Sequence, residues 1–392
     1  MKIRMAFLCS SYFLFYPKIG KEGAAILMQE DVNFTTIERQ MMSRAGRLHI
    51  PINGSIELLP LCNMNCDMCY VRLSPEEMKV KGRLRSTDEW ISIAEEMKES
   101  GVLYLLLTGG EPLLYPGFRK LFLQLQSLGM VLTINTNGTL IDKDWVDFFA
   151  AHKPRRINIT LYGASEASYE VLCHYGAGFQ RVIRAVNLLK EADIDVKLST
   201  SLTRKNLHDL EAMHDLAEEL GVPLHTDTYM MPSTRERTLP YAYQVRLDPE
   251  QAARARIYAL RREFGEEGWA QYRARCIFEV ENILPEEGPY HNTCHAGKCS
   301  FTINWQGDIH PCVVVDHPSA SVFEVGFEQA WQQVSSAFRG YTMTESCSSC
   351  NLRPVCRTCL ACAALETGDY KGLPRYMCDY AKASYHFIKD NV

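Results

Sequence analysis

Hydrophobic and polar positions follow two alternating patterns between residues 55 and 265. Short aliphatic and β-branched runs predict strands that are buried on both faces. Longer stretches between them repeat apolar residues at helical spacing, for example at 87–100, 118–128, 179–192 and 207–220. The predicted strands are Ser55–Leu59, Val102–Leu107, Val131–Asn135, Arg156–Leu161, Asp195–Ser201 and Leu224–Tyr229. This alternation predicts an α/β fold with a parallel sheet and outer helices.

Six such units are too few for a closed eight-fold barrel. The pattern fits an open or partial barrel and also a doubly wound sheet, and it does not decide between them. For the helix at 207–220, we expect Asn206 to be the N-cap and Gly221 to end it.

The pattern changes after residue 230, where three prolines interrupt the chain and a further helix is predicted at about 251–263. From Cys294 onward, strands become few and cysteines dominate. Pro285, Gly288 and Pro289 predict a break between two domains. We therefore divide the chain into an N-terminal extension (1–50), a strand–helix domain (51–265), a linker (266–292) and a cysteine-rich domain (293–392).

The N-terminal extension begins with an apolar run over residues 5–16 that follows Lys2 and Arg4. It has some features of a signal peptide, but Ser10 and Ser11 interrupt it and no small-residue cleavage site follows. A β-hairpin with strands near 5–16 and 24–29 is the preferred interpretation, with a helix after it.

Composition narrows the class of protein. The chain has 392 residues, a formal net charge of −5 and 15 cysteines. The charge argues against a nucleic-acid-coating surface, and no apolar run is long enough for a membrane span. Tight cysteine clusters in so long a chain favour metal ligation in a reducing cytoplasm over disulfides.

The first cysteine cluster, Cys62-x3-Cys66-x2-Cys69, follows the first predicted strand directly. Thiolates at this spacing can bind one face of an iron–sulfur cluster, because soft sulfur ligands select such clusters. Three cysteines leave one iron without a protein ligand, as a reactive site requires. The alternative is a structural zinc site, which closes all four positions and needs a further, distant ligand.

This motif resembles the signature of the radical S-adenosylmethionine (radical SAM) enzymes. The resemblance implies a partial (β/α)6 TIM-type barrel. It also implies that the open iron chelates S-adenosylmethionine (SAM) and that an electron from the cluster cleaves it to methionine and a 5′-deoxyadenosyl radical, which abstracts hydrogen. Further matches lie at the ends of predicted strands, where barrel enzymes keep their chemistry. By resemblance, the cofactor-binding residues are Met68, Gly109, Gly110, Glu111, Asn137 and Thr160.

The C-terminal cysteines resemble a SPASM domain, which carries two auxiliary [4Fe–4S] clusters, so the resemblance implies three clusters in all. One auxiliary cluster would use Cys294, Cys299, Cys312 and Cys359, and the other Cys347, Cys350, Cys356 and Cys378. The loop after Cys356 is one residue shorter than in the family, and Cys362 is the alternative to Cys359. Cys9, Cys173 and Cys276 would then bind no cluster. Two zinc ribbons are the competing interpretation of this region.

The resemblance to SPASM-bearing enzymes implies a peptide substrate, with a thioether or other crosslink installed in a ribosomally made precursor peptide. Sulfatase-maturing relatives have an aspartate base directly after the third auxiliary cysteine, where this chain has Val313. Asp316 is a weak candidate for a substitute base. A small-molecule radical SAM enzyme, a sulfatase-maturing enzyme and a non-enzymatic iron–sulfur scaffold are the alternatives.

We expect a precursor peptide as partner and a flavodoxin or ferredoxin as electron donor. About 50 residues precede the barrel, which is short for a complete leader-binding domain, so a separate leader-binding protein is also expected. Nucleic acid and membrane are not expected as partners.

Overall fold

The computed structural model describes residues 34–231, 245–284 and 294–391. The predicted N-terminal hairpin and Cys9 lie outside these ranges. Within them, nine strands form one sheet in the order β6-β5-β4-β3-β2-β1-β7-β8-β9. Their bounds are β1 (Asn53–Glu57), β2 (Tyr104–Thr108), β3 (Val131–Thr136), β4 (Arg156–Thr160), β5 (Val196–Ser201), β6 (Leu224–Asp227), β7 (Ser300–Ile303), β8 (Asp308–His310) and β9 (Ala320–Ser321).

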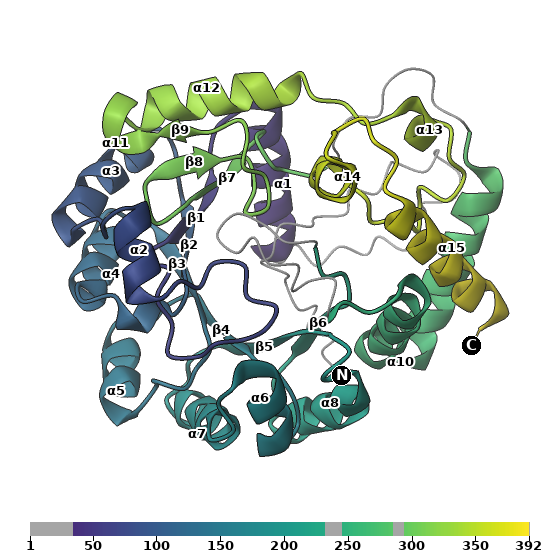
Figure 1. Cartoon of the computed structure of the whole chain (residues 1–392), viewed down its shortest axis with the longest axis horizontal. Helices are drawn as coiled ribbons and strands as arrows, with labels where there is room; N and C mark the ends of the chain where they lie inside the picture. Colours follow the sequence, from purple (N-terminus) through teal and green to yellow (C-terminus); the bar gives the residue numbers. More distant parts are fainter. Residues whose placement is uncertain (1–33, 232–244, 285–293, 392) are drawn as a thin grey trace.

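Strands β1 to β6 are parallel and pair in sequence order. A doubly wound sheet would reverse its strand order at a switch point, so the partial barrel is the correct alternative. Helices α3, α4, α5, α7 and α8 form an outer arc around these strands (Figure 1). All six strands lie where the sequence predicted them, with ends that differ by two residues at most.

The barrel helices begin and end where the sequence provides caps. They are α2 (Pro75–Lys81), α3 (Thr87–Glu99), η1 (Pro112–Leu114), α4 (Phe118–Ser127), α5 (Lys143–Ala151), α6 (Glu166–Cys173), α7 (Gly178–Glu191), η2 (Leu207–Asp209) and α8 (Leu210–Glu219). Ser74 and Ser86 start α2 and α3 with capping boxes. Gly221, at φ +62°, follows α8 as predicted.

Asn206 occupies the predicted N-cap position, directly before η2, but does not cap the helix with its side chain. Asn206 Oδ1 instead accepts a hydrogen bond from the backbone N of Thr203, and its Nδ2 donates to the backbone oxygens of Tyr162 and Ser201. This amide is fully buried and joins two loops that follow neighbouring strands, an arrangement that local sequence does not reveal.

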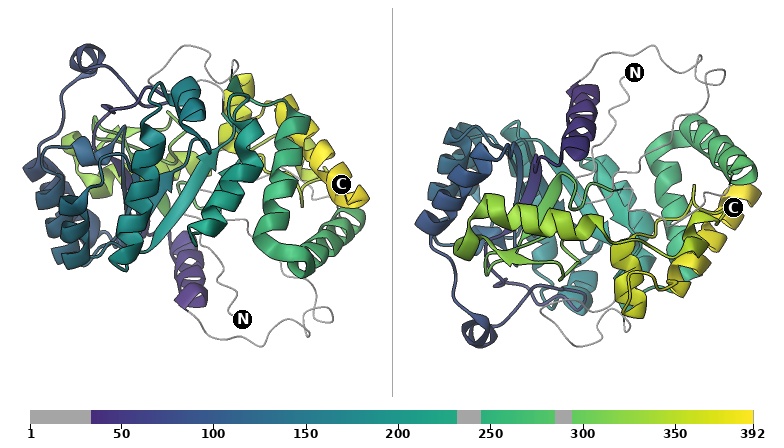
Figure 2. Two further views of the ribbon diagram at one scale, coloured as in Figure 1. Left: turned by 90° about the horizontal axis from the view of Figure 1, so that it is seen from below. Right: turned by 90° about the horizontal axis from the view of Figure 1, so that it is seen from above.

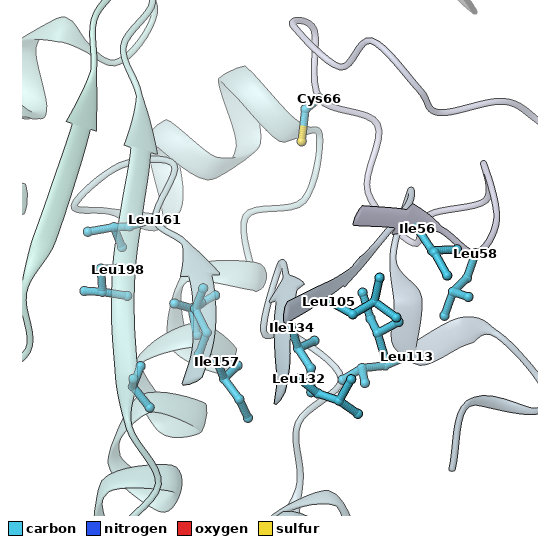
Figure 3. Packing of buried hydrophobic residues seen from close by; sticks show 14 of the residues in the cluster. Ile56, Leu58, Cys66, Leu105, Leu113, Leu132, Ile134, Ile157, Leu161 and Leu198 are labelled. Carbon is cyan, nitrogen blue, oxygen red and sulfur yellow. The ribbon is translucent and has the colours of Figure 1, made fainter. Parts of the chain in front are cut away.

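The two faces of the sheet differ in polarity. Ile157 and Ile159 of β4 point outward into the main apolar core under the helices, and Figure 3 shows Ile134, Ile157 and Leu198 on neighbouring strands of this core. Because side chains alternate along a strand, Asn158 and Thr160 point to the opposite, inner face. Lys197 of β5 is the register partner of Asn158 and is only 3% exposed. The barrel interior is therefore lined by polar groups.

The remaining helices are α1 (Phe34–Leu48), α10 (Pro249–Asn282), α11 (Val322–Val325), α12 (Phe327–Arg339), α13 (Glu345–Ser348), α14 (Leu360–Thr367) and α15 (Arg375–Asp390). Figure 2 shows α1 at the end of the barrel opposite α2, hence at the amino ends of the strands. None of the helices in the described ranges is long and apolar enough to cross a membrane.

Helix α10 corrects the predicted linker. It passes through a break at Gly265 (φ +65°, ψ 175°) and continues to Asn282, so residues 266–282 are helical. The second half buries Trp269, Cys276 and Val280, and Arg273 donates to the backbone oxygen of Ile388 at the end of α15. Packing against α15 thus continues the helix beyond a glycine that by itself predicts an end.

The cysteine-rich region is joined to the barrel through the sheet. Strand β7 pairs in parallel with β1, and β8 and β9 follow as antiparallel strands. Helix α12 packs beside α3, where Glu96 accepts a hydrogen bond from Phe327 N at the start of α12 (2.7 Å). The sheet is therefore continuous across the predicted domain boundary.

Candidate functional site

The first three cysteines lie in the loop between β1 and α2, at the carboxyl end of β1. Cys69 N donates to Cys66 O (3.1 Å), which curves the loop. Met64 N points at the Cys62 sulfur (3.4 Å) and Arg72 N at the Cys69 sulfur (3.3 Å). Backbone N–H groups aimed at sulfur stabilise thiolates, which is the form that binds metal. Burial, together with the other sulfurs and Glu111, raises the pKa of Cys62 to about 12 in the absence of a cation.

The loop is tied to the end of helix α6. Asn65 N donates to Cys173 O (3.2 Å) and Asp67 N to Leu172 O (3.0 Å). Burial opposes ionisation of Asp67, but hydrogen bonds from Lys205 and His174 outweigh it and lower the pKa of Asp67. These contacts fix the loop on both sides of Cys66.

The Gly109-Gly110-Glu111 turn follows β2 and lies directly against the start of the cysteine loop. Gly110 N donates to Leu59 O (2.7 Å), and Glu111 N donates to Leu61 O (2.9 Å). A Cβ on Gly110 would lie 2.2 Å from Leu61 O, and one on Gly109 (φ +143°) would lie 2.6 Å from Leu59 O. The glycines are therefore needed for close contact with the backbone at Leu59 and Leu61, three residues and one residue before Cys62.

Glu111 is fully buried between the ends of two strands. Its carboxylate accepts hydrogen bonds from Thr136 Oγ1 (2.8 Å), Asn137 N (2.8 Å) and Leu113 N (3.1 Å). Burial is the larger influence and raises the pKa of Glu111 to about 7. The side chain of this residue thus joins the β2 and β3 ends.

Asn137 connects the β3 end to the cysteine loop. Its Nδ2 donates to Asn63 Oδ1 (2.9 Å) and lies 3.6 Å from the Cys62 sulfur. Asn63 Nδ2 in turn donates to Thr139 Oγ1 (2.8 Å). Asn63 lies within the cysteine motif and carries no sequence signal of its own, so its role was not predicted.

The other two residues predicted to bind the cofactor lie close to this site. Thr160 ends β4 on the inner face of the barrel and is partly buried. Met68 is partly buried and packs against the main core. The structure thus brings the loop, the Gly-Gly-Glu turn and the β3 end into direct contact, and it places Thr160 at the same carboxyl edge of the sheet.

Two side chains that were not predicted to belong to the site of the first three cysteines lie beside Cys66. The Cys173 thiol and the Tyr162 hydroxyl lie near its sulfur, and their influence, Cys173 first, lowers the pKa of Cys66 against the effect of burial. Burial and the negative sulfur nearby raise the pKa of Cys173 and that of Tyr162, so both stay protonated. Spacing gave no signal, because Cys173 lies 107 residues beyond Cys66.

Four C-terminal cysteines form a second group: Cys347, Cys350, Cys356 and Cys378. Burial, together with the neighbouring sulfurs of the group, raises the pKa of Cys347 to about 11 and that of Cys356 to about 12. Burial and Cys350 also raise the pKa of Cys378. These four sulfurs are therefore close to one another, as the ligand set predicted for the second auxiliary cluster requires.

The remaining predicted ligands form a looser group. Cys294, Cys312 and Cys359 contact one small apolar cluster of the C-terminal region. Cys299 faces α1 instead, where its sulfur lies 3.5 Å from Met42 O and 3.3 Å from His295 Nδ1. Burial, together with the nearby Cys294 sulfur, raises the pKa of Cys299 to about 12.

Cys359 and Cys362 lie in different surroundings although their sulfurs are only 3.6 Å apart. Cys359 is partly buried and contacts both the main core and the small apolar cluster that Cys294 and Cys312 also contact. Cys362 is fully buried in the main core, and its sulfur hydrogen-bonds to Tyr229. The shared cluster favours Cys359 as the ligand.

Asp316, the weak candidate base, is exposed, and its backbone oxygen accepts a hydrogen bond from His310 Nδ1 (3.2 Å). Its carboxylate therefore has no burial that would adapt it for proton transfer. Val313, at the position of the sulfatase-maturase base, is partly buried.

The donor chemistry fits iron–sulfur clusters. In the described part of the chain, no three Cys, His, Asp or Glu side chains converge on a position for a single metal ion. The grouped side chains are cysteines, and their soft thiolates are the ligands that iron–sulfur clusters use.

Comparison with protein families agrees with this chemistry. The profile of the Radical SAM superfamily matches residues 56–217, and that of the SPASM iron-sulfur cluster-binding domain matches residues 294–351. The chain is a radical SAM enzyme with a SPASM domain. The first match spans β1 to α8 and the cysteine loop, and the second begins at Cys294.

Among its relatives, this radical SAM enzyme is 24% identical over 337 residues to an AdoMet-dependent heme synthase of Methanosarcina barkeri, covering 80% of this chain and 92% of the relative. It is 24% identical to the PqqA peptide cyclase of Bradyrhizobium diazoefficiens, covering 85% of this chain and 87% of that relative. The structure of Streptococcus suis SuiB bound to precursor peptide SuiA superposes with a TM-score of 0.65 at 18% identity, covering 93% of this chain and 84% of SuiB. That likeness establishes the shared fold.

Proposed function

We propose that this radical SAM enzyme modifies a ribosomally made precursor peptide, by abstracting hydrogen from a carbon of the peptide and installing a thioether or other crosslink. The observation that carries the proposal is the direct contact of the cysteine loop with the Gly-Gly-Glu turn and Asn137. A relative that cyclises a peptide supports the substrate class.

Cys62, Cys66 and Cys69 would hold a [4Fe–4S] cluster with one open iron. When bound, this cluster supplies the electron that cleaves SAM to methionine and a 5′-deoxyadenosyl radical. The chain's own part is to orient the site: Asn137 fixes the loop at Asn63, and Glu111 holds the β2 and β3 ends together. We propose that the Gly-Gly-Glu turn, Asn137, Thr160 and Met68 contact SAM.

Two auxiliary clusters would complete the set of cofactors. Cys347, Cys350, Cys356 and Cys378 would hold one, and Cys294, Cys299, Cys312 and Cys359 the other. The pKa values of Cys347, Cys356 and Cys378 are each raised by other sulfurs of the first set, which supports the first assignment. The contacts of Cys359 with the apolar cluster around Cys294 and Cys312 support the second.

The inner face of the sheet would receive the substrate. Asn158 and Lys197 are register partners on it and are 6% and 3% exposed, and Asp227 ends β6 nearby, where burial raises its pKa. Amide, ammonium and carboxyl groups can hydrogen-bond to the backbone of an extended peptide.

The protein is further proposed to act in the cytoplasm, with a flavodoxin or ferredoxin as electron donor and a separate leader-binding protein.

A second candidate function is modification of a small molecule, and the heme synthase relative favours it. Formylglycine formation is not proposed, since Val313 has no proton-accepting group and the nearby Asp316 carboxylate is exposed.

The test begins with anaerobic reconstitution of the full chain, which we expect to hold about twelve iron atoms in three clusters. Replacing Cys62, Cys66 and Cys69 together by Ala should leave about eight iron atoms and abolish SAM cleavage. Stoichiometric zinc with little iron would contradict the proposal.

Substrate class is tested with peptides encoded by short reading frames beside the gene. Deuterium at the attacked carbon of the true substrate should appear in 5′-deoxyadenosine. A tetrapyrrole serves as the competing substrate, and a Cys-x-Pro-x-Arg peptide as the control for formylglycine formation. Turnover of the tetrapyrrole alone would favour the second candidate, and efficient formylglycine formation would refute the exclusion of that reaction.

A further inference from the structure

Helix α2 lies close to the first three cysteines but does not pack into the core. It begins at Pro75, six residues after Cys69, and none of its residues is buried within the described part of the chain. Val80 is 88% exposed, more than any other large apolar residue in the described ranges. Figure 2 shows α2 projecting from the body of the molecule at the end opposite α1. The sides of this helix are therefore presented to solvent.

Both ends of α2 are nevertheless fixed. Just before its start, Leu73 N donates to Pro60 O (3.0 Å), two residues before Cys62. At its end, Gln306 Nε2 donates to Lys81 O (3.0 Å). These bonds hold the helix in a set position beside the cysteine loop, so a protein that docks on α2 lies next to that loop.

The segment around α2 is basic, although the whole chain is acidic. Residues 70–85 carry five basic and two acidic side chains, whereas the chain has a formal net charge of −5. The two acidic residues, Glu76 and Glu77, lie in the first turn of α2, and Glu77 is bound in the capping box. Lys79 and Lys81 are exposed in its last turn. The last turn therefore presents positive charge, which attracts an acidic partner.

We propose that α2 is the docking site of the electron donor, a flavodoxin-type protein with acidic residues around its flavin. The inference rests on the proposed cluster at Cys62, Cys66 and Cys69 and on the proposed class of donor. One electron passes from the reduced flavin to this cluster, which oxidises the flavin and reduces the cluster, and no bond forms or breaks.

The composition of α2 fits this partner. Lys79 and Lys81 would pair with carboxylates of the donor, and Val80 between them would contact the apolar dimethylbenzene edge of the flavin ring. An apolar contact surrounded by charged groups is the arrangement of a small, transient interface, and electron-transfer complexes are among the smallest. Arg83 is already paired with Glu89 (2.7 Å), so the two lysines supply most of the attraction.

The first measurement is the affinity of the reconstituted full-length enzyme for a purified flavodoxin, by surface plasmon resonance. We expect Lys79→Glu/Lys81→Glu to raise the Kd about tenfold at low salt. The Kd of the wild type should rise with ionic strength, and that of the variant should change little. Lys79→Gln/Lys81→Gln keeps good helix formers and should raise the Kd about threefold. It tests the charge even if the reversed pair does not form α2.

The second measurement compares two reductants in SAM cleavage. At subsaturating flavodoxin, Lys79→Glu/Lys81→Glu should slow the reaction about tenfold. Cleavage driven by dithionite, a small reductant that needs no docking site, should keep its wild-type rate, and the iron content should not change. Lys143→Glu/Lys382→Glu is the matched control, since it makes the same change in net charge at two exposed lysines on α5 and α15 and should leave both reactions and the affinity unchanged.

The third measurement locates the contact. A carbodiimide joins an amine to a neighbouring carboxylate, so it should link Lys79 or Lys81 to an acidic residue of flavodoxin. Crosslinks found only elsewhere would overturn the proposal, and so would equal affinity for flavodoxin in the wild type and in both lysine variants. Binding of a ferredoxin but not of flavodoxin at α2 would refute the choice of donor.

Failure of the proposed function gives different results. Without the cluster at the first three cysteines, dithionite would not drive SAM cleavage even in the wild type. Absence of peptide modification would refute the proposed substrate. In both cases the affinities for flavodoxin and the crosslinks can still be measured, and they decide whether α2 is the docking site.

Discussion

Replacing Gly110 by alanine should separate the Gly-Gly-Glu turn from the cysteine loop. The new Cβ would lie 2.2 Å from the Leu61 carbonyl oxygen, whereas ordinary contact begins at about 3.5 Å. The two backbones must therefore move apart by roughly 1 Å. Because Gly110 is not in the left-handed region, this contact is the whole cause of the strain.

The energy can be worked from the bonds that such a movement breaks. Gly110 N to Leu59 O and Glu111 N to Leu61 O are 2.7 and 2.9 Å long, and each bond contributes about 1 kcal/mol. Overpacking adds about 1–3 kcal/mol. We expect Gly110→Ala to lower the free energy of unfolding by about 3–5 kcal/mol in total.

Urea unfolding measures the loss of stability, and iron analysis of the reconstituted protein measures the loss of the first cluster. Iron should fall to about eight atoms, because the loop that holds the first three cysteines is displaced while the C-terminal cysteines are untouched. SAM cleavage should be lost. Gly340→Ala is the matched control, since Gly340 has φ −74° and its added Cβ would meet its nearest atom at 3.5 Å. Full iron, wild-type SAM cleavage and unchanged stability in Gly110→Ala would refute the reasoning.

Three further predictions concern single side chains. Cys359→Ala should lose about four iron atoms while Cys362→Ala keeps all three clusters, and iron analysis showing the reverse would exchange the two assignments. Because burial raises the pKa of Glu111 to about 7, its stabilising contribution should be present below about pH 4.3 and lost as the pH rises through about 7. As the pH rises from about 4.3 to above 7, the unfolding free energy of wild type, measured relative to that of Glu111→Gln, should thus fall by roughly 3 kcal/mol. A difference between the two proteins that does not change with pH would contradict this. Arg246 and Glu366 form an ion pair with side chains 6% and 9% exposed. In urea unfolding, Arg246→Leu should lower the free energy of unfolding by about 3–5 kcal/mol, because it leaves the buried Glu366 charge uncompensated. Replacing both residues by Leu removes both charges and should lower it by clearly less.

The strands and the cysteine chemistry could be predicted because their signals are local. Each barrel strand is a short apolar run, and the Gly-Gly-Glu turn and Cys62-x3-Cys66-x2-Cys69 are continuous motifs. The same locality explains why the six strand positions are confirmed to within two residues.

What the sequence did not reveal depends on contacts between distant segments. Helix α10 continues past Gly265 because its second half packs against α15, more than a hundred residues further on. Asn206 holds two loops rather than capping a helix. Cys173 looked like a spare thiol, and only the fold brings it to Cys66.

The pairing of β7 with β1 has a consequence for dissecting the enzyme. Asn53 to Ile56 of β1 are in register with Ser300 to Ile303 of β7, so a chain truncated at residue 292 would turn a central strand into an edge. The exposed row of backbone N–H and C=O groups would invite pairing with other chains. A truncated barrel is therefore expected to aggregate, and a chimera that exchanges the cluster-binding module must retain a β7-like strand to remain monodisperse.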